Sequence, residues 1–186
     1  QKYKRPLVIG SGNAAATGQI VFKGKDAVFA NENTYKEKLR IIKGIDAVFI
    51  FSASGGKHAP LMVKEAKRRR KPVFLVTNNP QSAAGQLIEE KQTLIFPKNR
   101  EPYTYNTSTY LPMILAKTKE NPQKILRHIE TKITAIKFNL KRYNAFYLII
   151  PPQFDLIRDM LDKKFVEMFG RRVAYSIYST EYIKHA

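Results

Sequence analysis

Residues 47–51 form a continuous apolar run, AVFIF, that ends abruptly in Ser52-Ala53-Ser54-Gly55-Gly56. Apolar residues at helical spacing follow between Leu61 and Ala66. A short apolar run bounded by turn residues is typical of a strand buried on both faces, as in a parallel sheet. Because glycines allow close approach of the backbone, hydroxyls donate to phosphate oxygens and a helix N-terminus favours negative charge, the segment predicts a phosphate-binding turn. Serine and glycine are also common in ordinary turns between a strand and a helix, so the alternative of a plain turn stays open.

The same alternation of strand and helix patterns extends over the first hundred residues. Strand patterns cover residues 6–10, 26–30, 47–51, 72–76 and 93–97, and helical patterns cover residues 35–43, 61–66 and 83–88. This alternation predicts an α/β fold, a three-layer, doubly wound sandwich around a mainly parallel five-stranded sheet. Right-handed crossovers place the loops after the strands at one edge of the sheet, where ligands collect. The loops at residues 10–14, 52–58 and 77–80 carry hydroxyls, amides or glycines, so we expect them to converge on an anion site.

A second α/β pattern begins near residue 145. It consists of a strand, an amphipathic helix and a strand, over residues 146–150, 154–169 and 173–178. One such unit cannot bury both faces of its sheet, so we expect the sequence to end inside a second, similar lobe. The predicted organisation is an α/β domain over residues 1–120, a linking helix over residues 121–144 and a partial second lobe over residues 145–186.

The composition narrows the classes of protein. The 186 residues include no cysteine, which excludes disulfides and thiolate metal sites. The sequence has no secretory leader pattern and no apolar run of membrane-spanning length, so we expect a cytoplasmic protein. His, Asp and Glu do not occur at metal-binding spacing, and no metal is expected.

The net charge of +18, from 33 Lys and Arg against 15 Asp and Glu, favours anionic partners of any kind. These partners include phosphorylated metabolites and nucleic acid. The basic cluster at residues 67–71 is interpreted as the solvated end of a helix, where positive charge complements the helix dipole. Because the sequence has no recognised nucleic-acid motif and no stripe of interleaved basic and aromatic residues, nucleic-acid binding is the less favoured alternative.

The SASGGK segment, residues 52–57, resembles the S-x-S-G-[NG]-[ST] signature of sugar isomerase (SIS) domains. The order of elements from Leu7 to about Ala116 is similar to that family as well, with TNNP after the fourth strand and NREPYTYNTSTY after the fifth. The second lobe resembles the double-SIS arrangement of bifunctional phosphoglucose/phosphomannose isomerases. The resemblance implies a homodimer that binds a sugar phosphate such as fructose 6-phosphate and needs no cofactor.

The resemblance also implies roles for individual residues of the first lobe. Ser52, Ser54 and Gly55 match the family's phosphate-binding turn. Lys57 stands where the family has Ser or Thr, and a lysine still binds phosphate as a point charge.

Four further residues match loops that face the sugar in the family. They are Gly12 and Asn13 after the first strand, and Arg100 and Glu101 after the fifth. Either Arg100 or Glu101 is expected to contact the substrate, and the sequence does not decide between them. His58 and Tyr110 are interpreted as structural.

Proton transfer is assigned to the second lobe. Glu167 resembles the glutamate that moves a proton between sugar carbons, and His185 resembles the histidine that assists ring opening. A partly buried carboxylate and an imidazole suit these roles chemically. From the helix alone, which is amphipathic and rich in Asp and Lys, a solvated surface residue is the favoured interpretation of Glu167. The sequence therefore predicts an aldose–ketose isomerase of hexose 6-phosphates, with a non-catalytic sugar-phosphate sensor as the alternative.

Overall fold

The computed structural model describes residues 2–98, 107–137, 139, 142–170 and 172–184. The chain divides into two compact units, residues 1–113 and residues 114–186. Among the described residues, no helix has both the length and the apolar character needed to cross a membrane.

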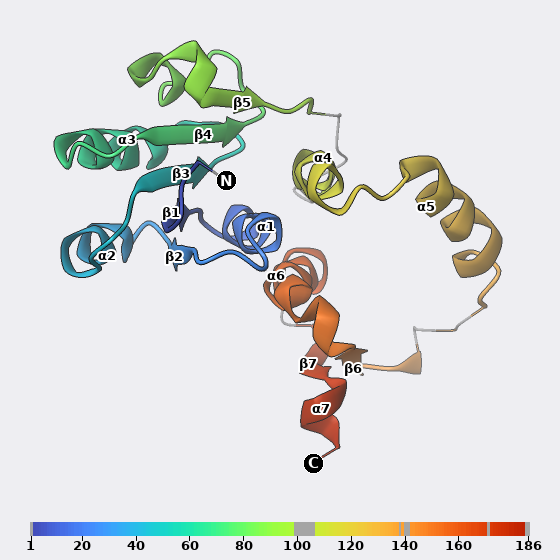
Figure 1. The fold of residues 1–186 in the computed structure, drawn as a ribbon. Helices are drawn as coiled ribbons and strands as arrows, with labels where there is room; N and C mark the ends of the chain where they lie inside the picture. Colours follow the sequence, from blue (N-terminus) through green and yellow to red (C-terminus); the bar gives the residue numbers. More distant parts are fainter. Residues whose placement is uncertain (1, 99–106, 138, 140–141, 171, 185–186) are drawn as a thin grey trace. The chain divides into compact units, whose positions relative to one another are not determined.

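The first unit is built on a parallel sheet of five strands in the order β2-β1-β3-β4-β5 (Figure 1). The strands are β1 (Pro6–Ile9), β2 (Val28–Ala30), β3 (Ala47–Phe51), β4 (Val73–Thr77) and β5 (Thr93–Ile95). All four pairings are parallel, which confirms the α/β fold class and the five strands predicted from the apolar runs. The chain winds outward in both directions from β1 and β3, so the point where the winding direction reverses lies between these two strands. In open parallel sheets, ligands bind at such a point, beyond the carboxyl ends of the strands.

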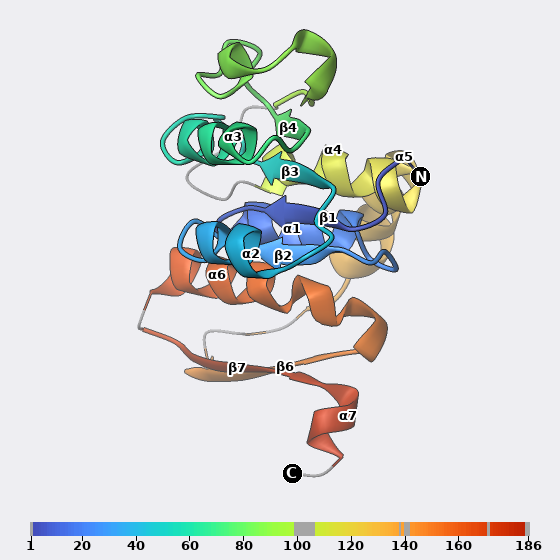
Figure 2. The ribbon, with the colours of Figure 1, turned by 60° about the vertical axis from the view of Figure 1, so that its left-hand side comes forward.

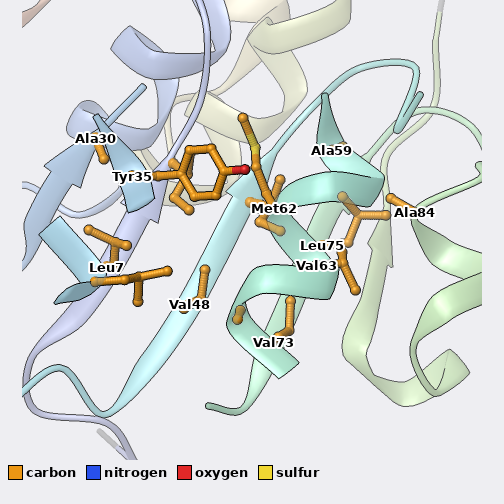
Figure 3. Packing of buried hydrophobic residues seen from close by; sticks show 14 of the residues in the cluster. Leu7, Ala30, Tyr35, Val48, Ala59, Met62, Val63, Val73, Leu75 and Ala84 are labelled. Atoms are coloured by element: carbon orange, nitrogen blue, oxygen red, sulfur yellow. The ribbon is translucent and has the colours of Figure 1, made fainter. Parts of the chain in front are cut away.

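Two helices, α2 (Tyr35–Ile41) and α3 (Ala59–Arg68), pack on one face of this sheet, as Figures 1 and 2 show. Their apolar sides meet the alternate residues of the strands that point to this face. Figure 3 shows the centre of this core, where Met62 and Val63 of α3 lie against the sheet residues Val48, Val73 and Leu75. These side chains are buried in one continuous cluster, and close packing of such a core holds the strands in place.

Helix α1 (Asn13–Val21) covers the opposite face, which completes the three layers (Figure 2). Gly18 allows its close approach, because a Cβ there would lie 2.8 Å from Cγ1 of Val8 and 3.3 Å from the ring of Phe51. One turn further on, Phe22 packs its ring against Phe49, with 5.0 Å between the centroids.

The region between β4 and β5 differs from the prediction. We predicted a helix over residues 83–88, but only a 3-10 turn forms, at Gly85–Leu87, followed by a second at Glu90–Gln92. Glycine disfavours a helix interior, and here the N–H groups of Leu87 and Ile88 bond three residues back, to the carbonyls of Ala84 and Gly85, which is the 3-10 pattern. Helix α4 (Thr107–Thr118) follows β5 and buries Tyr110 and Met113.

The second unit contains one parallel strand–helix–strand unit, made of β6 (Ala145–Ile150), α6 (Arg158–Phe169) and β7 (Ala174–Ser179). Gly170, with φ of 58°, ends α6. Helix α6 packs on the pair through Phe165, whose ring lies 4.7 Å from that of Tyr175. Before this unit come α5 (Pro122–His128) and a π-helical turn at Ile129–Ile133, and after it comes the short α7 (Thr180–Ile183).

Candidate functional site

A cavity of about 550 Å³ lies where the loops after β1, β3 and β4 meet. Gly10 and Ser11 contribute from the first loop, residues 52–54 and 56–58 from the second, and Asn78 and Asn79 from the third. The three loops that the parallel sheet was expected to bring together therefore do line one cavity. Its position matches the reversal of winding between β1 and β3, and its volume lies in the range of small-molecule sites.

The loop after β3 presents two serine hydroxyls to the cavity. The Oγ of Ser52 accepts the N–H of Gly55 at 3.2 Å, and the Oγ of Ser54 accepts the N–H of Gly56 at 3.3 Å. Both oxygens are thus occupied as acceptors by their own loop. Among the residues that the structure describes, neither hydroxyl proton has an acceptor, so both serines are free to donate.

Gly55 shapes this loop and does not itself line the cavity. Its φ is +58°, and a Cβ at this position would lie 2.4 Å from Cβ of Ser82. Its carbonyl accepts the N–H of Ala84 at 2.9 Å, which ties the loop to the segment after β4. A glycine is therefore required here by backbone conformation and by space.

The start of α3 adds positive character to the same wall. Lys57 lines the cavity in a left-handed conformation, with φ of 48°. In the described part of the chain it forms no ion pair, and the backbone N–H groups of Lys57 and His58 have no acceptor. Free N–H groups at the beginning of a helix attract anions, and the ammonium group of Lys57 reinforces this.

The loop after β4 holds the loop after β3, residues 52–58, in place; the latter is called the serine loop below. Asn78 donates its backbone N–H to the carbonyl of Ala53 at 3.0 Å, and Asn79 donates its side-chain amide to the carbonyl of Ser54 at 3.1 Å. The side chain of Asn78 also donates to the carbonyls of Phe96, Pro97 and Thr109. One asparagine therefore links three segments, and its own Oδ1 is buried without a partner among the described residues.

The loop after β1 contributes Ser11 rather than the two residues that the sequence singled out. The hydroxyl of Ser11 donates to Oε2 of Glu32, which lies just beyond β2. Gly12 and Asn13 do not line the cavity: Gly12 caps α1, and the side chain of Asn13 is buried.

The carboxyl of Glu32 is held in its charged form. The hydrogen bond from Ser11, followed by the backbone N–H of Glu32 itself, lowers its pKa. Partial burial opposes this shift without reversing it, and the electrostatic effect of the nearby His58 and Lys57 lowers the pKa further. A carboxylate is therefore bonded to one of the serines that line the cavity.

The other predicted site residues are distributed as follows. Arg100, Glu101 and His185 lie outside the described residues. Glu167 lies on α6 in the second unit, where its Oε2 is 3.5 Å from Nζ of Lys164. Within the described residues, no group of three or more His, Asp or Glu side chains is placed to hold a metal ion.

Sequence reasoning missed Ser11, Asn78, Asn79 and Lys98 as individual lining residues, and it assigned His58 and Tyr110 to structural roles although both border the cavity. The available signal was position, since most of them directly follow a strand of the parallel sheet.

No family model matches the sequence, and no curated protein matches it. Solved structures do match the fold. Tagatose-6-phosphate ketose/aldose isomerase from Escherichia coli aligns with a TM-score of 0.70 at 14% identity, over 98% of this chain and 58% of that one. Glucosamine-6-phosphate deaminase from Thermotoga maritima aligns with a TM-score of 0.66 at 16% identity, over 98% of this chain and 63% of that one.

A third match is the C-terminal domain of glucosamine-fructose-6-phosphate aminotransferase from Francisella tularensis, with a TM-score of 0.62 at 12% identity, over 99% of this chain and 61% of that one. The chain thus spans about three fifths of the length of these structures. At such identities the likeness is one of fold. Together with the strand order and the position of the serine loop, it shows that the chain has the fold of the sugar isomerase (SIS) domain.

Proposed function

We propose that the cavity binds a sugar phosphate, with the phosphate group held by the serine loop. The observation that carries this proposal is the pairing of Ser52 and Ser54 with their own loop amides, which leaves both hydroxyl protons available to an anion. The ammonium group of Lys57 and the free N–H groups at the start of α3 add further donors. Such a concentration of donors complements phosphate oxygens.

The fold neighbours support a phosphorylated hexose as the ligand. Their names refer to tagatose 6-phosphate, glucosamine 6-phosphate and fructose 6-phosphate. A cavity of about 550 Å³ has room for a molecule of this size.

The reaction we propose for the intact protein is aldose–ketose isomerisation of a hexose 6-phosphate. A carboxylate moves a proton between two neighbouring carbons, and an imidazole moves a proton at the ring oxygen. Glu167 and His185 are the proposed groups, acting in a homodimer.

Calorimetric titration with fructose 6-phosphate, with fructose and inorganic phosphate as comparisons, tests the binding proposal. We expect saturable binding that needs both the sugar and the phosphate. In the Ser52→Ala, Ser54→Ala double variant, the loss of two hydrogen bonds to a charged group is expected to weaken binding by about 2–4 kcal/mol. Unchanged affinity in a variant that melts like the wild type would contradict the proposal.

The contribution of Lys57 is tested with a matched pair of variants. Lys57→Ala removes a positive charge that lines the cavity. Lys64→Ala removes a positive charge from the exposed side of α3. We expect the first to weaken fructose 6-phosphate binding about tenfold and the second to leave it nearly unchanged, because exposed distant charges are screened by salt. Equal effects would show that only the overall positive field matters.

A sensor that binds without turnover is the second candidate. It is favoured by Lys57, which stands where the signature of the sugar isomerase domain has Ser or Thr, and by the exposed position of Glu167 on α6, where it pairs with Lys164. An assay for conversion of fructose 6-phosphate to its aldose isomers separates the two. Binding without conversion by the intact protein would assign the chain to the sensor class.

A further inference from the structure

Ser11, Ser52 and Ser54 line the cavity, and their hydroxyl groups have two different hydrogen-bonding roles. Ser52 and Ser54 use their oxygens to accept N–H groups and keep their protons. Ser11 does the reverse, because its proton is donated to Glu32. Toward the cavity, Ser11 can then offer only the lone pairs of its Oγ.

The direction of the bond between Ser11 and Glu32 follows from the charge of the carboxyl group. An ionised carboxylate has no proton to donate, so the serine must be the donor. The groups around Glu32 keep it ionised: the Ser11 hydroxyl and its own backbone N–H lower its pKa, and the electrostatic effect of the nearby His58 and Lys57 acts in the same direction.

The fold places these two residues together. Glu32 is two residues beyond the end of β2, and Ser11 is two residues beyond the end of β1. The two strands are paired in register, Ile9 with Ala30, and the N–H of Gly10 donates to the carbonyl of Ala30 at 3.2 Å. The carboxylate is therefore fixed by neighbouring strand ends and does not depend on a long loop.

We propose that Glu32 is a positioning residue that fixes Ser11 as a hydrogen-bond acceptor, so that the cavity selects phosphate esters that carry hydroxyl groups over inorganic phosphate. This proposal rests on the proposed function, since it assumes that the phosphate occupies the serine loop. A sugar phosphate then meets donors at the serine loop and an acceptor at Ser11. Inorganic phosphate held in the serine loop brings no sugar hydroxyl to Ser11 and leaves this acceptor unmatched.

The measured quantity is the ratio of the dissociation constant of inorganic phosphate to that of fructose 6-phosphate, obtained by calorimetry. Loss of the Glu32 charge changes the electrostatic attraction of both ligands in the same direction, so the ratio reports mainly on recognition of the sugar hydroxyls. Ser11→Ala removes the acceptor oxygen. Glu32→Ala removes the partner of the Ser11 hydroxyl proton, so this hydroxyl is free to turn and donate into the cavity. We expect each variant to lower the ratio about tenfold.

Three further variants separate this role from a merely structural one. Glu32→Gln keeps an acceptor oxygen for the Ser11 proton and is expected to keep most of the ratio. The Ser11→Ala, Glu32→Ala double variant is expected to lower the ratio no further than either single variant, because Glu32 acts through Ser11. Glu37→Ala, which removes a carboxylate from the exposed side of α2, is expected to leave the ratio unchanged.

The possible failures are distinguishable. If the wild type prefers fructose 6-phosphate to phosphate and Glu32→Ala or Ser11→Ala keeps the wild-type ratio, the role of Glu32 is overturned and the proposed function stands. If the effects of Ser11→Ala and Glu32→Ala simply multiply in the double variant, Glu32 does not act through Ser11. If the wild type shows no preference for fructose 6-phosphate, the proposed function itself fails, and this inference fails with it.

Discussion

At the scale of single residues, the serine loop depends on Gly55. Its positive φ is shared by Gly24, but the two sites differ in space: a Cβ at Gly55 would clash with Ser82, whereas nothing lies within 4 Å of a Cβ at Gly24. Alanine substitutions at these two glycines therefore compare the free-energy cost of a left-handed backbone alone with that of a left-handed backbone plus a steric clash.

We expect Gly24→Ala to lower the free energy of unfolding by about 1 kcal/mol, the usual cost of a left-handed alanine. We expect Gly55→Ala to lower it by about 2–3 kcal/mol, because Ser82 must also move. Urea denaturation measures both values. Equal losses in the two variants would show that Ser82 yields freely and that the loop is less constrained than its geometry indicates.

At the scale of the elements, the strands of the sheet differ in how deeply their side chains are buried. Leu75 of β4 is fully buried between the sheet and α3, whereas Leu94 of the neighbouring edge strand β5 is 57% exposed. The same substitution at these two leucines compares a central strand with an edge strand.

Leu75→Ala is expected to lower the free energy of unfolding by about 2–5 kcal/mol, because it removes buried apolar surface and leaves a cavity. Leu94→Ala is expected to cost less than about 1 kcal/mol. Denaturation of the two variants in parallel measures the difference. A large loss at Leu94 would mean that β5 is covered in solution.

The same elements show how far sequence reasoning reaches. The strands were predictable because each is a short apolar run between turn residues, and the meeting of their loops follows from parallel pairing alone. The α-helix predicted over residues 83–88 was wrong because Gly85 disfavours a helix interior and the backbone closes into 3-10 bonds instead. The role of Ser11 as a donor to Glu32 was not predictable from the sequence. It depends on Glu32, which is 21 positions away and comes close only through strand pairing.

At the scale of the whole molecule, the excess of positive charge is partly engaged within the fold. Several cationic side chains donate to backbone carbonyls at the ends of elements: Lys38 to Phe29, Lys67 to Leu87, Arg69 to Leu39 and Lys71 to Ile45. Cations near helix C-termini and free carbonyls stabilise the fold, so charge alone is no measure of affinity for nucleic acid.

We therefore expect binding of a single-stranded oligonucleotide to be non-specific and confined to low ionic strength. The reason is that such binding rests on counterion release and falls steeply with salt. Fluorescence anisotropy between 20 and about 200 mM salt, on the scale of such electrostatic effects, measures this dependence. Tight binding that persists at about 150 mM salt would restore the nucleic-acid alternative.

The cavity is assembled from three loops that are far apart along the chain. A ligand that bridges them would act as a reversible cross-link between the ends of β1, β3 and β4. Local opening of any one loop would then require release of the ligand, which couples the three openings through mass action. Amide hydrogen exchange in all three loops would slow together on binding, whereas exchange at the opposite ends of the same strands would change little.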